Sequence, residues 1–177
     1  MTPQVEAAIE LLRNAELDTD RGMPEALFWT VSALIPVPNV DLLIVNGRGE
    51  LLLSWRKDDF YGESWHIPGG CMHFNESFGH CIQETAKREI HTEVDYDEEA
   101  VAVRNVIRGL HYSQRHPRER GHNVAMLFRC RLPEGFEIDN GQLCESDNGY
   151  LKWFAKLPED FMQIQHIYDD ILEPWRI

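Results

Sequence analysis

Glu89 is a carboxylate placed where a helical pattern would otherwise put an apolar side chain. Residues 76–91 have helical periodicity, and at about 100° per residue Glu89 falls on the apolar stripe. It also falls in the last turn, where the helix dipole disfavours an anion by about 1 kcal/mol or less. A buried anion there requires a cation, which a divalent metal would supply. The stripe contains Phe78, Cys81, Ile82, Thr85 and Ala86, whereas Glu84, Lys87, Arg88 and His91 are expected to face water.

A double glycine precedes this helix and completes the predicted metal site. Gly69 and Gly70 have no side chains, so their backbone groups can approach a metal ion or a phosphate closely. We expect Mg²⁺, with Mn²⁺ as an alternative, to bind Glu89 and a carbonyl of Gly69 or Gly70, because Mg²⁺ takes oxygen ligands and keeps waters for substrate phosphates. A salt bridge from Glu89 to Arg56, or exposure of the helix end, is the structural alternative.

This segment resembles the signature of the Nudix hydrolases, GX5EX7REUXEEXGU, in which U is an aliphatic residue. Residues 65–70 resemble the family's lead-in, Glu76 falls on the first glutamate of the signature, and Glu89 falls on the last, which binds metal in the family. Three positions depart from the signature: Glu84-Thr85 replaces the Arg-Glu pair, Arg88 replaces the penultimate glutamate, and His91 replaces the late glycine.

A second alignment inserts four residues and takes Arg88-Glu89 as the Arg-Glu pair, with Glu93 as the last glutamate. Four residues add about one helical turn and carry the end of the helix about 6 Å further along. The ungapped alignment is therefore preferred. Glu89 is functional in both alignments.

A signature without its Arg-Glu pair is similar to that of the GDP-mannose mannosyl hydrolase branch, which keeps one metal-binding glutamate. The likeness extends over roughly residues 24–156. It implies that Asp41 and Arg56 contact the nucleoside diphosphate of the substrate, that His111 lies near it, and that His122 is a further substrate-binding candidate. Alternatively, Asp41 ends a strand, Arg56 pairs with a neighbouring aspartate, and the histidines are hydrogen-bonded strand residues.

Two positions of that branch differ in this chain. Cys71 follows the double glycine, where the branch has an arginine that would stabilise the leaving diphosphate. The loop before the late Trp-containing strand, residues 145–150, has no histidine to act as a base. We expect Asp147, then Glu145, to ligate metal or to take a proton from water, with His111 as a further candidate. A solvated acidic loop is the alternative.

Together these residues predict a Mg²⁺-dependent hydrolase of a small nucleotide-linked molecule. Because few carboxylates are left to gather a second metal, attack of water at a sugar carbon is favoured, as in a GDP-mannose-like glycosyl hydrolysis that releases the nucleoside diphosphate. Pyrophosphate cleavage of a nucleoside diphosphate sugar, ADP-ribose or a nucleoside triphosphate is the runner-up. A nucleotide-binding Nudix module without catalysis is the third possibility.

The elements that position these groups follow from the hydrophobic pattern. Helices are expected over 3–14 and 24–34, a β-hairpin over 40–55, and short helices at the C-terminus. Further strands are expected near 65–70, 100–110, 123–132 and 150–154. The predicted fold is α/β (α+β), and the resemblance implies a Nudix-type α/β/α sandwich with a mixed sheet. We expect an N-terminal helical extension over 1–35 and the Nudix domain over 36–177.

The composition limits the partners. A net charge of −13 over 177 residues argues against a general electrostatic hold on nucleic acid. No apolar run approaches the roughly 18 residues of a membrane helix, and the first residues lack the features of a secretory signal. We expect a cytoplasmic enzyme whose four cysteines stay as thiols, with no nucleic-acid or membrane partner. The two N-terminal helices allow a homodimer contact.

Overall fold

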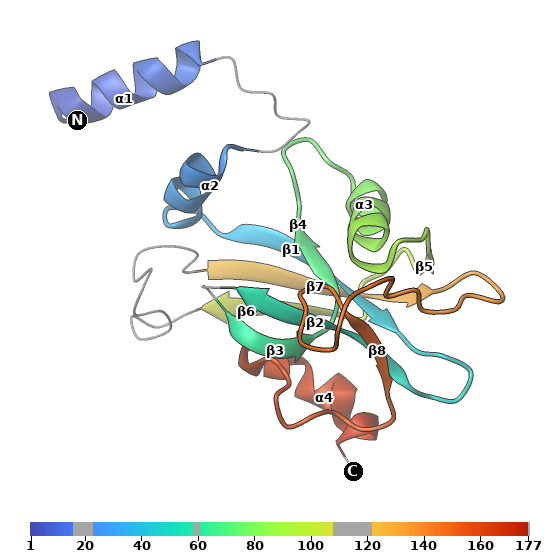
Figure 1. Ribbon diagram of the computed structural model, residues 1–177. Helices are drawn as coiled ribbons and strands as arrows, with labels where there is room; N and C mark the ends of the chain where they lie inside the picture. The colour runs from blue at the N-terminus through green and yellow to red at the C-terminus, as the bar shows by residue number, and fades with distance from the viewer. Residues whose placement is uncertain (16–22, 59–60, 108–121, 177) are drawn as a thin grey trace.

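The computed structural model describes residues 1–15, 23–58, 61–107 and 122–176. His111 and the basic segment around it lie outside these residues. The structure has an α+β architecture in which strands form the centre and helices cover them (Figure 1). In chain order the elements are α1 (Pro3–Asn14), α2 (Glu25–Ser32), β1 (Val37–Ile44), β2 (Leu51–Asp58), β3 (Gly62–His66), β4 (Gly69–Cys71), α3 (Phe78–Ile90), β5 (Asp95–Tyr96), β6 (Ala102–Ile107), β7 (His122–Arg131), β8 (Leu151–Phe154), η2 (Gln163–Tyr168), α4 (Asp169–Leu172) and η3 (Glu173–Trp175).

The strands form two sheets. The larger sheet has five strands in the order β4-β1-β7-β5, with β6 also pairing with β7. It is mixed, because β1 and β7 are parallel from Val37 opposite Asn123 to Ile44 opposite Cys130, whereas the other pairs are antiparallel. The smaller sheet has the order β3-β2-β8. The predicted mixed α+β sandwich is therefore confirmed.

The predicted hairpin of β1 and β2 is wrong. After one isolated bridge between Val45 and Leu51, the two strands separate into different sheets. The reason is that both hydrogen-bonding edges of β1 are already taken, one by β4 and the other by β7. The turn at residues 46–49 therefore connects two sheets.

Alternation along β1 divides the core in two. Val40, Leu42 and Ile44 pack in one cluster with the inner face of α3. Leu43 packs in the other cluster, with Tyr168 and the C-terminal helices. Figure 1 shows α3 and α4 on opposite sides of the strands. Because side chains alternate along a strand, Asp41 shares the face of Leu43 and points toward the C-terminal helices.

Helix α3 begins and ends close to its predicted limits. Ser77 is its N-cap and accepts a hydrogen bond from the backbone N–H of His80 at 3.2 Å. Cys81, Ile82, Thr85, Ala86 and Ile90 are buried, as an inward stripe requires. Phe78 is a correction, since it is 48% exposed instead of buried. It sits at the first residue of the helix, where its ring contacts the edge of the core at Phe128.

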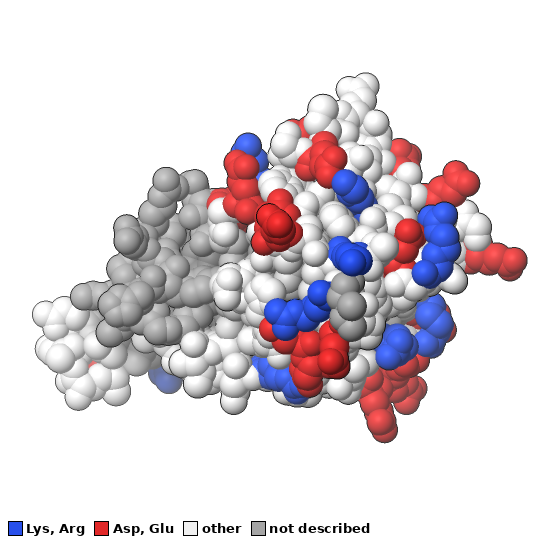
Figure 2. Space-filling view, turned by 90° about the horizontal axis from the view of Figure 1, so that it is seen from below, with Lys and Arg blue, Asp and Glu red and all other residues white. Residues whose placement is uncertain are grey.

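The N-terminal helices stand apart from this core. Thr2 caps α1, and α1 has no buried residue. In Figure 1 this helix extends away from the strands, whereas α2 lies near the start of β1. No helix within the described ranges is both long and apolar enough to cross a membrane. On the face shown in Figure 2, the described Lys and Arg side chains lie among Asp and Glu side chains.

Candidate active site

The end of α3 meets the double glycine of β4. Glu89 lies in the last turn, and its side chain is 22% exposed. Arg88 Nε donates to Glu89 Oε1 at 3.1 Å, and Arg88 Nη2 donates to the carbonyl of Gly69 at 3.3 Å. One cationic side chain thus contacts both the carboxylate and the carbonyl that the sequence predicts as metal ligands. Arg88 is exposed as expected, with 54% of its side chain accessible, and the end of that side chain turns back to these two oxygens.

Helix α3 supports the ungapped alignment. Glu89 falls inside the helix, whereas Glu93 lies beyond its end and pairs with Lys87 at 3.3 Å. Glu76, the first glutamate of the alignment, closes the loop before the helix. Its carboxylate accepts from the backbone N–H of His73 at 2.7 Å and contacts His80 Nδ1 at 2.9 Å. Glu76 therefore stabilises the entry to the helix.

Glu89 opens onto a cavity of about 420 Å³, open solvent included, that lies against strands β2 and β3. Arg56 and His66 line it, and both also line a second cavity of about 490 Å³ that contains Asp41. The two cavities therefore meet at Arg56 and His66. The remaining residues of the Glu89 cavity are Ser54, Trp55, Lys57, Asp58, Asn148 and Gly149.

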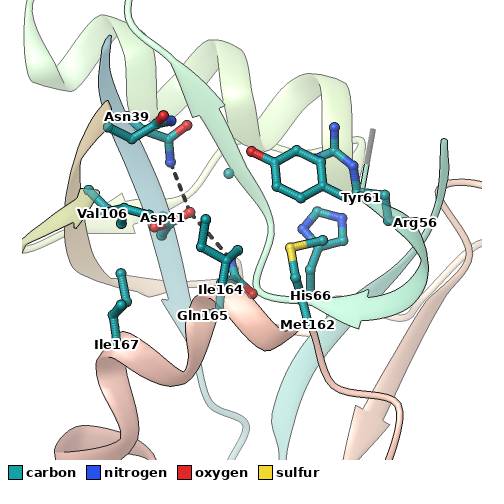
Figure 3. A pocket seen from close by; sticks show the side chains of 13 residues that line it. Asn39, Asp41, Arg56, Tyr61, His66, Val106, Met162, Ile164, Gln165 and Ile167 are labelled. Carbon is teal, nitrogen blue, oxygen red and sulfur yellow. Dashed lines mark hydrogen bonds between the residues drawn. The ribbon is translucent and has the colours of Figure 1, made fainter. Parts of the chain in front are cut away.

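Asp41 is the buried polar centre of the second cavity. It is 5% exposed, and its carboxylate accepts from Tyr168 Oη at 2.7 Å, Asn39 Nδ2 at 3.0 Å and Gln165 Nε2 at 3.5 Å. Burial raises the pKa of Asp41 to about 6, against the lowering effect of these three hydrogen bonds. Figure 3 shows Asp41 with Asn39 and Gln165 on one side of the cavity and Tyr61, Arg56 and His66 on the other.

Gln165 joins this cavity to the double-glycine segment, and the sequence analysis missed it. Its Oε1 accepts from the backbone N–H of Ile67 at 2.7 Å, and its Nε2 donates to the carbonyl of Ile67 at 3.0 Å. The same amide thus contacts Asp41 and the residues that lead into β4. Nothing local marks Gln165, because it comes 124 positions after Asp41.

His66 is the second residue that sequence reasoning missed, although it belongs to the lead-in of the signature. It is 5% exposed, and its Nδ1 lies 2.9 Å from the carbonyl of Ile67, which can only accept. Burial lowers the pKa of His66 to about 4, and the nearby charge of Arg56 adds to this effect. The ring is therefore neutral near pH 7, with its proton on Nδ1 and Nε2 as an acceptor.

Arg56 combines the two roles that the sequence left open. Its Nε donates to Asp58, and its guanidinium carbon lies 4.4 Å from the centroid of the Tyr61 ring. Asp58 also accepts from the backbone N–H of Tyr61 at 2.6 Å. Arg56 thus has a neighbouring aspartate as its partner and still lines both cavities. A guanidinium held in this way is suited to an anionic group such as a phosphate.

The remaining predicted residues lie elsewhere. Asp147 Oδ2 accepts from the backbone N–H of Cys144 at 2.7 Å, and Glu145 pairs with Lys152 at 2.6 Å. Both are exposed, and neither lines the two cavities. His122 Nε2 lies 3.2 Å from Asn105 Oδ1, and its neighbour Asn123 lines the Asp41 cavity instead. The structure thus brings together Gly69, Asp41 and Arg56 around one cavity and Arg56 and Glu89 around the other.

Three buried polar atoms along the two cavities have no hydrogen-bond partner within the described part of the chain. Asn123 Oδ1 belongs to the Asp41 cavity, and Ser54 Oγ and Trp55 Nε1 belong to the Glu89 cavity. A buried polar atom without a partner is unfavourable by about 1–3 kcal/mol.

The donor set near Glu89 fits one hard cation. A carboxylate oxygen of Glu89 and the carbonyl oxygen of Gly69 both contact the same positive group, Arg88. Such oxygen donors are the ligands that Mg²⁺ prefers, with water filling the remaining positions. Within the described residues there is no group of three His, Cys, Asp or Glu side chains that could hold a metal ion. Glu89, the backbone oxygen of Gly69 and water would then be the ligands of a metal bound here.

Comparison with known proteins finds one matching family model and several solved structures with a similar fold. A family model described as the NUDIX domain matches residues 35–161. The solved structure of a MutT NUDIX hydrolase from Burkholderia pseudomallei has a TM-score of 0.57 and 18% identity, covering 77% of this chain and 98% of that chain. A UDP-X diphosphatase has a TM-score of 0.51 and 17% identity, covering 94% and 79%. The MutT protein from Methanosarcina mazei Go1 has a TM-score of 0.51 and 18% identity, covering 77% and 95%.

At these identities the solved structures show that the fold is shared, and they carry no information on the substrate or the reaction. Among curated proteins, no match was found.

Proposed function

The chain belongs to the Nudix family of hydrolases, and from this we propose that it hydrolyses a nucleoside diphosphate linked to a sugar or a similar group, with a divalent metal. The observation that carries the proposal is the shared cation contact of Glu89 and the Gly69 carbonyl beside a cavity lined by Arg56. Glu89 and a carbonyl of Gly69 or Gly70 would hold Mg²⁺ or Mn²⁺. When bound, this metal neutralises phosphate charge and lowers the pKa of water.

Different residues of the chain would bind the phosphate and the non-phosphate parts of the substrate in the two cavities. Arg56 lines both, so it would bind the phosphates where the cavities meet. Asp41, Asn123 and Gln165 surround the second cavity with hydrogen-bonding groups and would hold the non-phosphate part. His122, predicted to bind substrate, lies beside this cavity on the same strand, so its role stays part of the proposal.

Four residues are candidates for the group that orients the attacking water. Asp147, Glu145 and His111 are the candidates from the sequence. His66 is a candidate from the structure, because it is neutral near pH 7, its Nε2 is free of a proton, and it lines both cavities. We expect His66→Gln to lower turnover by about 10²-fold or more, and Asp147→Asn to lower it less, since Asp147 already closes a turn.

Two reactions are compatible with this site, and they differ in the bond that is broken. No group of three His, Cys, Asp or Glu side chains that could gather further metal is present in the described residues, and this supports attack at the sugar carbon, as in the GDP-mannose mannosyl hydrolase branch. Cleavage of the diphosphate at phosphorus is the alternative, and the UDP-X diphosphatase that shares this fold is named for that reaction. Carbon attack leaves a nucleoside diphosphate and free sugar, whereas phosphorus attack leaves a nucleoside monophosphate and a sugar phosphate.

The test is a screen of nucleotide sugars, ADP-ribose and nucleoside triphosphates with and without Mg²⁺, with products separated by chromatography. Glu89→Gln should lose nearly all metal-dependent turnover. Glu84→Gln is the matched control, since Glu84 is an exposed glutamate of the same helix that pairs with Lys87 at 3.4 Å. Turnover unaffected by Glu89→Gln would contradict the metal site. Nucleotide binding without any turnover would favour a non-catalytic module.

The N-terminal helices carry two further predictions. The boundary at residue 35 and the homodimer contact stay predictions, supported by the exposed apolar side chains of α1 and the absence of buried residues in it. Gel filtration of the full chain at micromolar concentration tests the dimer. A clean monomer would exclude it.

A further inference from the structure

Arg88 and Glu89 are neighbours on α3, yet their side chains meet. Adjacent positions on a helix point about 100° apart and do not normally face each other. Here Arg88 Nε reaches Glu89 Oε1 at 3.1 Å while Nη2 of the same guanidinium reaches the Gly69 carbonyl at 3.3 Å. The side chain also lies over Gly70, where an added Cβ would be 2.6 Å from Nη2. The guanidinium thus fills the space between the helix end and β4.

A metal ion and this guanidinium compete for the same two oxygens. The guanidinium nitrogens lie 3.1 and 3.3 Å from these oxygens, and Mg²⁺ binds oxygen at about 2.1 Å, so a metal bound there would lie within a few ångströms of the guanidinium charge. Two positive charges at so short a distance repel each other. Binding of the metal therefore favours release of Arg88.

We infer that Arg88 is a resident cation of the Glu89 site, which keeps the two ligand oxygens together without metal and competes with the metal for them. The inference rests on the proposed metal site at Glu89 and adds a residue that sets the affinity of that site. Because Arg88 is half exposed, a released guanidinium moves into solvent without unfolding the helix.

Lys87 offers a control within the same turn. Both residues are basic side chains in the last turn of α3, so both favour the helix dipole. Lys87 pairs with Glu84 and Glu93 and makes no contact with Glu89 in the described residues. Lys87→Gln and Arg88→Gln therefore remove the same charge from the same helix end. Only the second change removes a group from the proposed site.

The experiment measures Mn²⁺ affinity of the full chain by electron paramagnetic resonance of free Mn²⁺, without substrate. We expect Arg88→Gln to bind Mn²⁺ about three- to ten-fold more tightly than the unchanged protein, and Lys87→Gln to stay within about twofold. Arg88→Lys keeps the charge without the planar fork and should fall between them. Circular dichroism checks that each variant is folded.

The outcomes separate this inference from the proposed function. If Mn²⁺ binds and depends on Glu89, but Arg88→Gln binds equally or more weakly, the competition is wrong and the metal site stands. If Lys87→Gln tightens binding as much as Arg88→Gln does, the effect is one of net charge and the inference is again wrong. If neither the unchanged protein nor Arg88→Gln binds Mn²⁺, both the inference and the metal site fail.

Discussion

The hydroxyl of Tyr168 donates a 2.7 Å hydrogen bond to Asp41 Oδ2 across 127 positions of the chain. It ties the last residue of η2 to the middle of β1, and both groups are buried. The influences on the pKa of Asp41 are burial and hydrogen bonds from neutral side chains, so this carboxylate is held without a compensating cation. Its charge is therefore sensitive to every donor that contacts it.

Removal of that donor should destabilise the protein in a pH-dependent way. Tyr168→Phe is expected to lower the free energy of unfolding by about 1–3 kcal/mol at pH 7, where Asp41 is mostly ionised. The loss should be smaller at pH 4, because a protonated carboxyl is less dependent on a donor. Urea unfolding at both pH values measures the difference. An equal loss at pH 4 and pH 7 would show that lost packing, and not the hydrogen bond, is responsible.

Removal of the charge should have the opposite effect. The pKa of Asp41 is raised from 3.8 to about 6 in the folded state, so the folded state is favoured while Asp41 is protonated, and this contribution is lost as pH rises through about 6. Asp41→Asn has no such loss. It should be more stable than the unchanged protein by up to about 3 kcal/mol at pH 7.5, with the difference vanishing near pH 4.

Thermal unfolding across this pH range tests the Asp41 prediction. Asparagine keeps an oxygen that can accept from Asn39 and Gln165, and its amide can donate to the Tyr168 hydroxyl oxygen, which reverses the direction of that hydrogen bond. If Asp41 also binds substrate, the more stable variant should bind substrate more weakly. A variant that is less stable at pH 7.5 would contradict the buried-charge account.

A side chain at Gly69 should disturb both the fold and the site. An added Cβ would lie 2.3 Å from Asp41 Oδ1 and 2.8 Å from the backbone carbonyl of Val40. Backbone cannot move aside easily, so Gly69→Ala should destabilise the protein by about 1–3 kcal/mol, the range for overpacked sites. Gly47→Ala is the control, because nothing lies within 4 Å of its added Cβ. Chemical denaturation measures the free energy of unfolding of both variants. An equal loss in the two would contradict the close approach of Asp41 and Val40 to Gly69.

Replacement of His91, the residue that follows α3, by glycine should stabilise the protein. His91 has φ 63° and ψ 25°, a left-handed conformation that L side chains adopt at a cost of about 1 kcal/mol. His91→Gly should therefore raise the free energy of unfolding by about 0.5–1 kcal/mol. His91→Ala keeps the unfavourable Cβ and should give no gain. Equal stabilities of the two variants would show that the backbone is not strained here.

The elements were largely predictable because their signals are local. The limits of α3 follow from helical periodicity and from Ser77 at its start, and the pattern of β7 follows from its long apolar run. Pairing of the strands was not predictable from local signals, since the partners of β1 come from β4 and from β7, far along the chain. The hairpin prediction failed for that reason.

The site was predictable only in part, for a similar reason. Glu89, Gly69, Asp41 and Arg56 were selected by residue type and by resemblance, and they line one or both cavities. Gln165 reaches Asp41 through tertiary structure, so no spacing could indicate it. The helical wheel correctly placed Arg88 toward water, but its contacts with Glu89 and Gly69 were not predictable, because a wheel gives the direction of Cβ and not the path of a long, flexible side chain.

Under the proposed function, the two faces of β1 serve different parts of the site. One face of the strand packs under α3, which carries Glu89, and the other face presents Asp41 to a cavity lined in part by residues of η2. If that cavity holds the non-phosphate part of the substrate, mutations on the Asp41 face would alter which molecule is accepted while the packing that orients Glu89 stays unchanged. Such a protein would acquire a new specificity through gradual sequence drift, with its reaction centre inherited intact.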